Sequence, residues 1–211
     1  MLRKTNIASA LIFLTIVPIT AGCGMFSTKN KGEKARENDN ALTGQWRNGC
    51  SKLDWLGFAY HQETLKFSAI GDCDRVTTLF SDSSCTNATA TLSERGTYAS
   101  LGASRVAAGA QDINFTVTQA TVTADSDDAV SLLNNASYCG ISTWQKNQAV
   151  DVMGKTCDGS NHPKGEVIFD VYRVDNDSKR LETGKGTLFV DKSDANSRPG
   201  KLDDAHPYLR Q

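Results

Sequence analysis

The sequence predicts a mainly β protein, with seven to eight antiparallel strands and one short helix in a single domain. Short segments rich in Thr, Val, Phe and Tyr are separated by clusters of Gly, Asp, Asn and Ser, as strands and turns are in all-β proteins. Helix signals occur in one segment, at residues 126–139. The chain has 211 residues, 39% of them hydrophobic, which is enough for one substantial core. No internal repeat and no shift in composition marks a second folded domain.

The first residues predict an export signal. The chain begins MLRK, with two cations ahead of an apolar run at residues 7–19. That run is too short to cross a bilayer comfortably as a permanent helix, and a basic start followed by an apolar run is typical of signal peptides.

The apolar run ends in ITAGCG, where two small residues precede Cys23. This segment resembles the lipobox of bacterial lipoproteins, although Thr20 stands where that family usually has leucine. The resemblance implies that Cys23 is lipidated and becomes the first residue of the mature protein, which acyl chains then hold at the membrane of the bacterial cell envelope. Gly24 is not the aspartate associated with inner-membrane retention, so the resemblance implies the outer membrane. The alternative is a plain signal peptide cut nearby, with Cys23 as an incidental thiol.

These features divide the chain into three parts. Residues 1–22 are the expected signal peptide, and residues 23–41 are polar and charged with almost nothing to bury, so they are expected to form a flexible tether. Residues 42–211 are the expected β domain. The formal net charge is −1 and no Lys/Arg cluster forms a long basic face, which excludes nucleic acid as an expected partner.

The β domain is expected to consist of hairpins. The clearest hairpin is VYRVDNDSKRLETGKGTLFV, with the polar VDNDSKR as its turn, and INFTVTQATVTA alternates as a half-buried strand does. Closure into a barrel would remove exposed edges. Beyond a first strand at TGQW, the seven to eight expected strands include residues 58–68, 75–81, 113–124, 165–174 and 184–191.

The predicted helix has a recognisable start. Ser126 is placed to cap it, and Asp127 and Asp128 lie in the first turn, where the helix dipole favours negative charge. An apolar patch should hold the helix against the sheet, and it consists of Val130, Leu132 and Leu133.

The first strand carries a family resemblance. Gly44 and Trp46 in TGQW resemble the Gly-x-Trp signature of the lipocalin and wider calycin barrels. The order that follows, with Cys50, then Cys85 in FSDSSC and then RGTYASLG, is similar to a lipocalin-like domain of bacterial lipoproteins and secreted Wnt antagonists. The resemblance covers about residues 42–102 and implies a lipocalin-like antiparallel β-barrel.

The same resemblance implies roles for single residues. Trp46 should plug the closed end of the barrel beside Gly44, with an arginine from late in the chain stacked on its indole. Arg173, Arg198 and Arg210 are the candidates, and Arg198 is the one we assign.

Cysteine usage fits an oxidising compartment. With Cys23 lipidated, five cysteines remain, and counting leaves their pairing open. The resemblance implies that Cys73, in the hairpin turn IGDCDR, is the odd one, as a free thiol or in a competing bridge to Cys50 or Cys85. The implied disulfides are Cys50 with Cys85 and Cys139 with Cys157.

Catalytic and metal-binding patterns are not found in the sequence. His61, His162 and His206 are scattered and none adjoins a Ser or Cys nucleophile. No Cys/His pair has zinc-ligand spacing, and the Asp clusters lack the glycine and glutamate of a calcium loop. We therefore expect no enzyme activity, no metal and no cofactor.

Two functions remain. The first is a membrane-anchored envelope lipoprotein that binds a small apolar or amphipathic ligand in its barrel. The second is a structural or interaction lipoprotein with a filled barrel, whose loops contact envelope or cell-surface proteins. A set of inward apolar side chains could line a cavity or fill the barrel, namely Leu65, Phe67, Phe115 and Val117.

Overall fold

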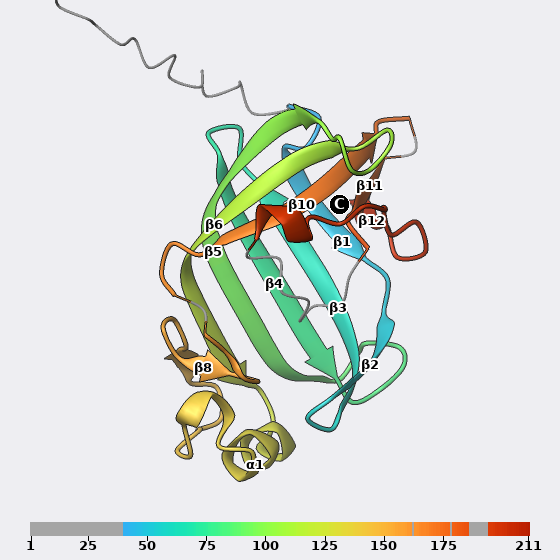
Figure 1. The fold of residues 1–211 in the computed structure, drawn as a ribbon. Coiled ribbons are helices and arrows are strands. Elements are labelled where there is room, and N and C mark those ends of the chain that lie inside the picture. Colours follow the sequence, from blue (N-terminus) through green and yellow to red (C-terminus); the bar gives the residue numbers. More distant parts are fainter. Residues whose placement is uncertain (1–39, 162, 178, 186–193) are drawn as a thin grey trace, which may run out of the picture. The chain divides into compact units, whose positions relative to one another are not determined.

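Eight antiparallel strands close into a barrel in the computed structural model, which describes residues 40–161, 163–177, 179–185 and 194–211 (Figure 1). The expected signal peptide, Cys23 and nearly all of the expected tether lie outside the described residues. A mainly β domain with one short helix was predicted, and the described residues confirm it.

The ring of strands is closed by β1, which pairs with β3 on one side and with β12 on the other. Every pairing around this ring is antiparallel. In ring order the strands are β1 (Gly44–Asn48), β3 (Phe58–Phe67), β4 (Asp72–Phe80), β5 (Ala88–Ala103), β6 (Gln111–Ala124), β10 (Val167–Asp175), β11 (Arg180–Thr183) and β12 (Tyr208–Arg210).

Smaller elements extend the barrel. Strand β2 (Ser51–Trp55) pairs with the first half of β3, while β1 pairs with its second half. Strand β7 (Ala149–Asp151) pairs with β6. The remaining elements are a two-stranded sheet of β8 (Thr156–Cys157) and β9 (Ser160–Asn161), and the 3-10 turns η1 (Tyr138–Gly140) and η2 (Ala195–Ser197).

Most of the predicted strands are confirmed. The segments expected at 58–68, 75–81, 113–124 and 165–174 correspond to β3, β4, β6 and β10. The predicted hairpin is formed by β10 and β11, although the strand expected at 184–191 lies mostly outside the described residues. Strand β5 was not predicted, because its small and charged residues have weak strand preference.

Helix α1 (Asp127–Asn135) begins where the sequence predicted. The Ser126 side chain accepts a hydrogen bond of 3.1 Å from the Ala129 N–H, as an N-cap residue does. Ala129 and Leu133 face inward and are buried. The helix lies at the lower end of the barrel in Figure 1, and it therefore covers one end of the strands.

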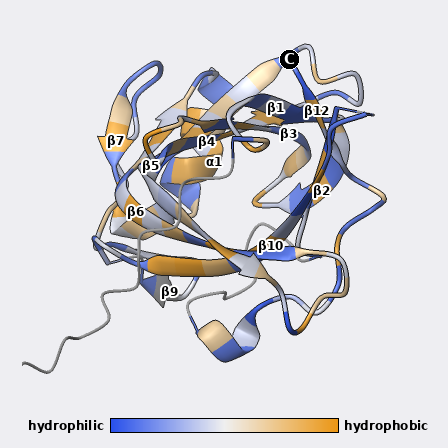
Figure 2. Cartoon of the chain, turned by 90° about the horizontal axis from the view of Figure 1, so that it is seen from above, coloured by the Kyte–Doolittle hydropathy of each residue, from blue (hydrophilic) through white to orange (hydrophobic). Residues whose placement is uncertain are grey.

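Seen from above, the strands surround the interior of the barrel (Figure 2). This interior contains two apolar clusters, one at each end of the long strands. The plug cluster includes Trp46, Leu65, Phe67, Tyr98, Ile113, Tyr172 and Leu181. The helix cluster includes Phe58, Leu79, Ala90, Val122, Leu133, Tyr138 and Trp144. Because β3 supplies Phe58 to one cluster and Phe67 to the other, the middle of the barrel separates them.

Candidate functional site

The plug end of the barrel is built around Trp46. Its side chain is fully buried, and its Nε1–H donates a 2.7 Å hydrogen bond to the Leu42 carbonyl. The guanidinium carbon of Arg210 lies 4.4 Å from the ring centroid, a cation–π contact. Arg210 Nη2 also donates to the Ala41 carbonyl, and Gly44 lies beside this guanidinium at the start of β1. The indole is thus held by the segment before β1 and by the last strand, β12.

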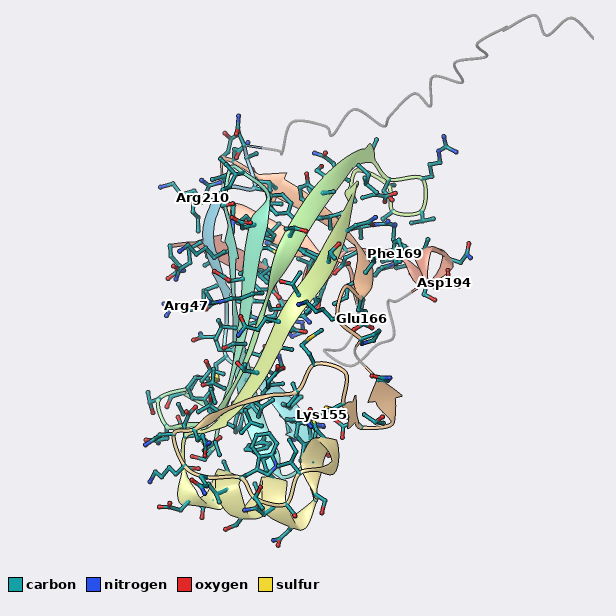
Figure 3. The ribbon with its side chains drawn as sticks, turned by 90° about the vertical axis from the view of Figure 1, so that its left-hand side faces the viewer. Arg47, Lys155, Glu166, Phe169, Asp194 and Arg210 are labelled. Atoms are coloured by element: carbon teal, nitrogen blue, oxygen red, sulfur yellow. A yellow bond between two sulfur atoms is a disulfide. The ribbon has the colours of Figure 1, made fainter. Side chains whose placement is uncertain are left out.

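The assignment of Arg198 to this position was wrong. Arg198 lies over the ring of Phe169, 5.5 Å from its centroid, and donates a 2.9 Å hydrogen bond to the Ile113 carbonyl. Arg210 occupies the predicted position because β12 pairs directly with β1, in a register that sets Arg210 opposite Trp46. Figure 3 shows Arg210 and Phe169 on opposite sides of the barrel.

Two disulfides connect the loops. Cys50 is bonded to Cys85, and Cys139 is bonded to Cys157, as the resemblance implied. Cys73 is a free thiol and half-buried, but it is the second residue of β4 rather than part of a turn. Burial raises the pKa of Cys73 to about 12, so this thiol is a poor nucleophile.

A polar layer lies inside the barrel between the two apolar clusters. Glu63 is buried, and its carboxylate accepts a 2.8 Å hydrogen bond from the Tyr208 hydroxyl and a longer one, 3.5 Å, from Thr77. The backbone N–H of Glu63 donates to Asn48 Oδ1 at 2.6 Å. Burial, and then the charge of Glu63, raises the pKa of Tyr208 well above its usual value, so the phenol stays protonated as a donor.

The second part of the polar layer is an ion pair between Arg75 and Glu94. The two residues are opposite each other in the β4–β5 register, and 32% and 29% of their side-chain surfaces stay accessible. Burial alone would lower the pKa of Arg75, but the charges of Glu94 and Glu63 outweigh it and raise that pKa. The middle of the barrel is therefore polar.

Sequence reasoning missed this layer, although a signal was present. Glu63 is two residues before Leu65 and four before Phe67 in the same strand, and those two residues were expected to face inward. Side chains alternate between the two faces of a strand, so this even spacing places Glu63 inside.

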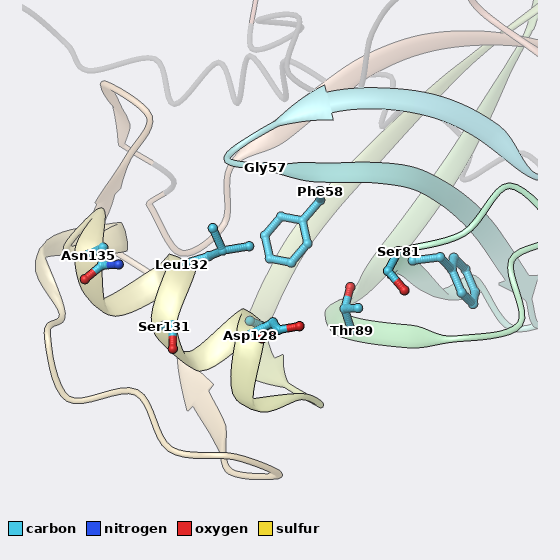
Figure 4. Close-up of a pocket in the computed structure, with 10 residues that line it drawn as sticks. Gly57, Phe58, Ser81, Thr89, Asp128, Ser131, Leu132 and Asn135 are labelled. Atoms are coloured by element: carbon cyan, nitrogen blue, oxygen red, sulfur yellow. The ribbon is translucent and has the colours of Figure 1, made fainter.

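A groove of about 360 Å³ lies between helix α1 and the adjacent ends of β3, β4 and β5 (Figure 4). We call it the α1 groove. Its apolar wall combines two buried aromatic rings, Phe58 and Phe80, with Leu132 of the helix. The other lining residues are Gly57, Ser81, Thr89, Asp128, Ala129, Ser131 and Asn135.

One wall of the α1 groove includes Gly57, in the turn before β3. Its φ is +87°, a conformation that side chains rarely adopt, and a Cβ there would stand 3.1 Å from Leu132 Cδ2. The turn backbone can therefore pack closely against the helix. Of the apolar helix residues in the sequence, Leu133 is buried against the barrel, whereas Leu132 faces the groove.

The two acidic residues of the first helical turn differ in their surroundings. Asp127 forms an ion pair of 3.0 Å with Lys146. Asp128 lines the α1 groove and forms no ion pair with another described residue. Asp128 therefore supplies a carboxylate that a ligand in the groove could contact.

The two described histidines, His61 and His206, lie in separate segments of the fold. His61 lies in β3, His206 is hydrogen-bonded to Asp203 before β12, and His162 is outside the described residues. Within the described ranges, no group of three or more His, Cys, Asp or Glu side chains is arranged to hold a metal ion. In that same part of the chain, no helix is long and apolar enough to cross a membrane.

Comparison with known proteins gives no family assignment, since no protein-family model and no curated protein sequence matches this chain. The resemblance to a known kind of protein rests on the fold. A closed barrel of eight antiparallel strands with one short helix, counted over the described residues, is consistent with a lipocalin-like fold.

Proposed function

We propose that this protein is a non-catalytic lipoprotein of the bacterial cell envelope whose barrel domain binds a small apolar or amphipathic ligand. The observation that carries the proposal is the α1 groove. Its volume of about 360 Å³ is at the lower end of the range of roughly 300–1,000 Å³ that is usual for small-molecule sites.

The chemistry of the α1 groove suits an amphipathic molecule. Half-buried Leu132, together with the almost fully buried Phe58 and Phe80, forms an apolar wall for a hydrocarbon part, and hydroxyl, amide and carboxylate groups line the groove for a polar end. The two apolar clusters and the polar layer occupy the barrel interior. The ligand site we propose is therefore at the helix end of the barrel.

The proposed anchor comes from the sequence. Two small residues before Cys23 and the apolar run upstream support lipidation at this cysteine and removal of residues 1–22. The outer membrane is the proposed location, because Gly24 follows the cysteine. Several acyl chains would anchor the protein firmly, and the polar residues after Cys23 would let the barrel reach a ligand away from the bilayer surface.

Native mass spectrometry of the full-length protein, extracted from its own membrane, tests ligand binding. We expect an additional small-molecule mass on the wild type and its loss in Leu132→Trp, which fills the α1 groove. Leu209→Trp is the matched control, because Leu209 is 53% exposed on β12. A wild type without any added mass, or a Leu132→Trp variant that retains it, would contradict the proposed site.

A second candidate is a structural or interaction lipoprotein. It is favoured by the packing of the interior, where Trp46, Leu79 and Leu181 are no more than 1% exposed. Its loops would contact envelope or cell-surface proteins, and Val106 is 54% exposed after β5. A photo-cross-linker placed at Val106 in living cells should then capture one defined protein partner, whereas capture of none would contradict this candidate.

A further inference from the structure

We propose that the α1 groove selects a ligand with a positively charged amino group attached to a small apolar body. This inference rests on the proposed function, namely that the groove binds a small molecule. It adds the sign of the charge that the ligand carries.

The charge of the lining carries the inference. Asp128 is the charged residue among the described residues that line the α1 groove, and none of these lining residues is a Lys, Arg or His. The remaining polar groups are neutral hydroxyls and one amide. An ammonium group would form a charge-assisted hydrogen bond with the carboxylate, whereas an anionic end group would be repelled by it.

The aromatic residues of the groove also favour a positively charged ligand. Phe58 and Phe80 are among the residues that line the groove, and aromatic faces attract cations. In Figure 4 the Asp128 side chain extends from the helix on the side where Thr89 lies, and Phe58 lines the same groove. An amino group at this point could contact the carboxylate while its apolar body lies against Phe58 and Leu132.

Asp128 is also available for a ligand. Its neighbour Asp127 is engaged by Lys146 at 3.0 Å, and no described residue neutralises Asp128 in this way. Both residues lie in the first turn of α1, so the helix dipole acts on both carboxylates alike. Asp127 is therefore a matched internal control for the charge of Asp128.

The test compares three ligands of similar size and different charge: 2-phenylethylammonium, 2-phenylethanol and 3-phenylpropanoate. Each is titrated calorimetrically into the full-length protein held in lipid nanodiscs, and the heat of protein-free nanodiscs is subtracted. We expect the ammonium compound to bind on the order of fivefold more tightly than the alcohol, with the carboxylate weakest. Asp128→Asn should abolish this preference, and Asp127→Asn should keep it.

The outcomes separate the inference from the function on which it rests. Equal affinity for the three compounds, or a preference that survives Asp128→Asn, would overturn charge selection but leave small-ligand binding in place. Binding of none of the three would overturn both. Loss of the preference in Asp127→Asn to the same extent as in Asp128→Asn would also overturn the assignment, because the groove lining includes only the second residue.

Discussion

Single residues at the plug end tie the two ends of the described chain together. The indole of Trp46 in β1 bonds to the Leu42 carbonyl and is covered by Arg210 of β12. These contacts close the ring of strands, because β1 and β12 are neighbours there. The stability of the barrel should therefore depend strongly on this one side chain.

Trp46→Ala should bring the protein close to unfolding. Truncating a buried tryptophan costs about 3–5 kcal/mol, against a total stability of about 5–15 kcal/mol. Urea denaturation measures the change in the free energy of unfolding. Leu209→Ala, at a site that is 53% exposed, should change it by less than about 0.5 kcal/mol. A Trp46→Ala midpoint equal to that of the wild type would contradict the plug role.

His61 should make the barrel less stable in mild acid. Burial, and then the charge of His206, lowers the pKa of His61 below 6.5, and its buried Nδ1 has no hydrogen-bond partner among the described residues. The unfolded chain keeps the ordinary pKa, so it binds more protons as the pH falls through this window. The contribution of neutral, buried His61 to the free energy of unfolding is therefore fully present above pH 6.5. It is lost as the pH falls through the lower pKa that His61 has in the folded state.

Urea titrations at about pH 7.5 and about pH 5.5 test this dependence. The free energy of unfolding of the wild type should fall more between the two pH values than that of His61→Gln. The common loss from the other titrating groups cancels in this comparison. An equal loss in the two proteins would show that His61 does not titrate within the window.

Among the elements, β5 shows how local irregularity shapes the barrel. Its register with β6 shifts between Arg95 and Gly96 and again between Ser100 and Gly102. At the first shift the two backbones approach closely, since a Cβ on Gly96 would stand 1.9 Å from the Thr116 carbonyl oxygen. Such bulges bend a long strand around a barrel, which explains why a glycine is needed there.

Gly96→Ala should destabilise the barrel by about 3 kcal/mol or more, because backbone rather than a flexible side chain blocks the added methyl group. Thermal unfolding followed by circular dichroism measures the loss. Gly49→Ala is the control, since a Cβ there meets no heavy atom within 4 Å. If both variants had the same thermal unfolding midpoint as the wild type, the close approach of β5 and β6 would be refuted.

At the scale of the whole molecule, the barrel leaves little strand edge exposed around its ring. The loops are fixed by disulfides, with Cys50 bonded to Cys85 and Cys139 bonded to Cys157. Closure and cross-linking suit a domain that functions outside the cytoplasm, where disulfides persist. They agree with the export signal that the sequence predicts.

Cys23→Ser should abolish lipidation. The change removes the thiol to which we propose that the lipid is attached, so metabolic labelling with a fatty-acid analogue should mark the wild type and leave the variant unlabelled. The variant should also retain an uncleaved or miscleaved signal, visible as an altered mass. Cys73→Ser serves as the control and should label normally. Equal labelling of Cys23→Ser and the wild type would contradict the anchor.

The sequence predicted those parts of the fold that depend on local pattern. Apolar and polar residues alternate along β6, and Ser126 is followed by two acids at the start of α1, so both elements could be assigned from neighbouring residues. The disulfide partners could be matched because the cysteine order resembles that of a known domain. Strand β5 was not predicted, because its pairing rather than its composition makes it a strand.

By itself, the sequence determined the fold class, the helix, the hairpin of β10 and β11 and the burial of Trp46. Only the tertiary structure decided that Arg210 rather than Arg198 covers the indole, that the charge of Glu63 acts on Arg75, and that Asp128 lines a groove. The physical reason is the range of the contacts. Helix caps and strand alternation are set by residues a few positions apart, whereas these sites arise when strands distant in the chain become neighbours as the barrel closes.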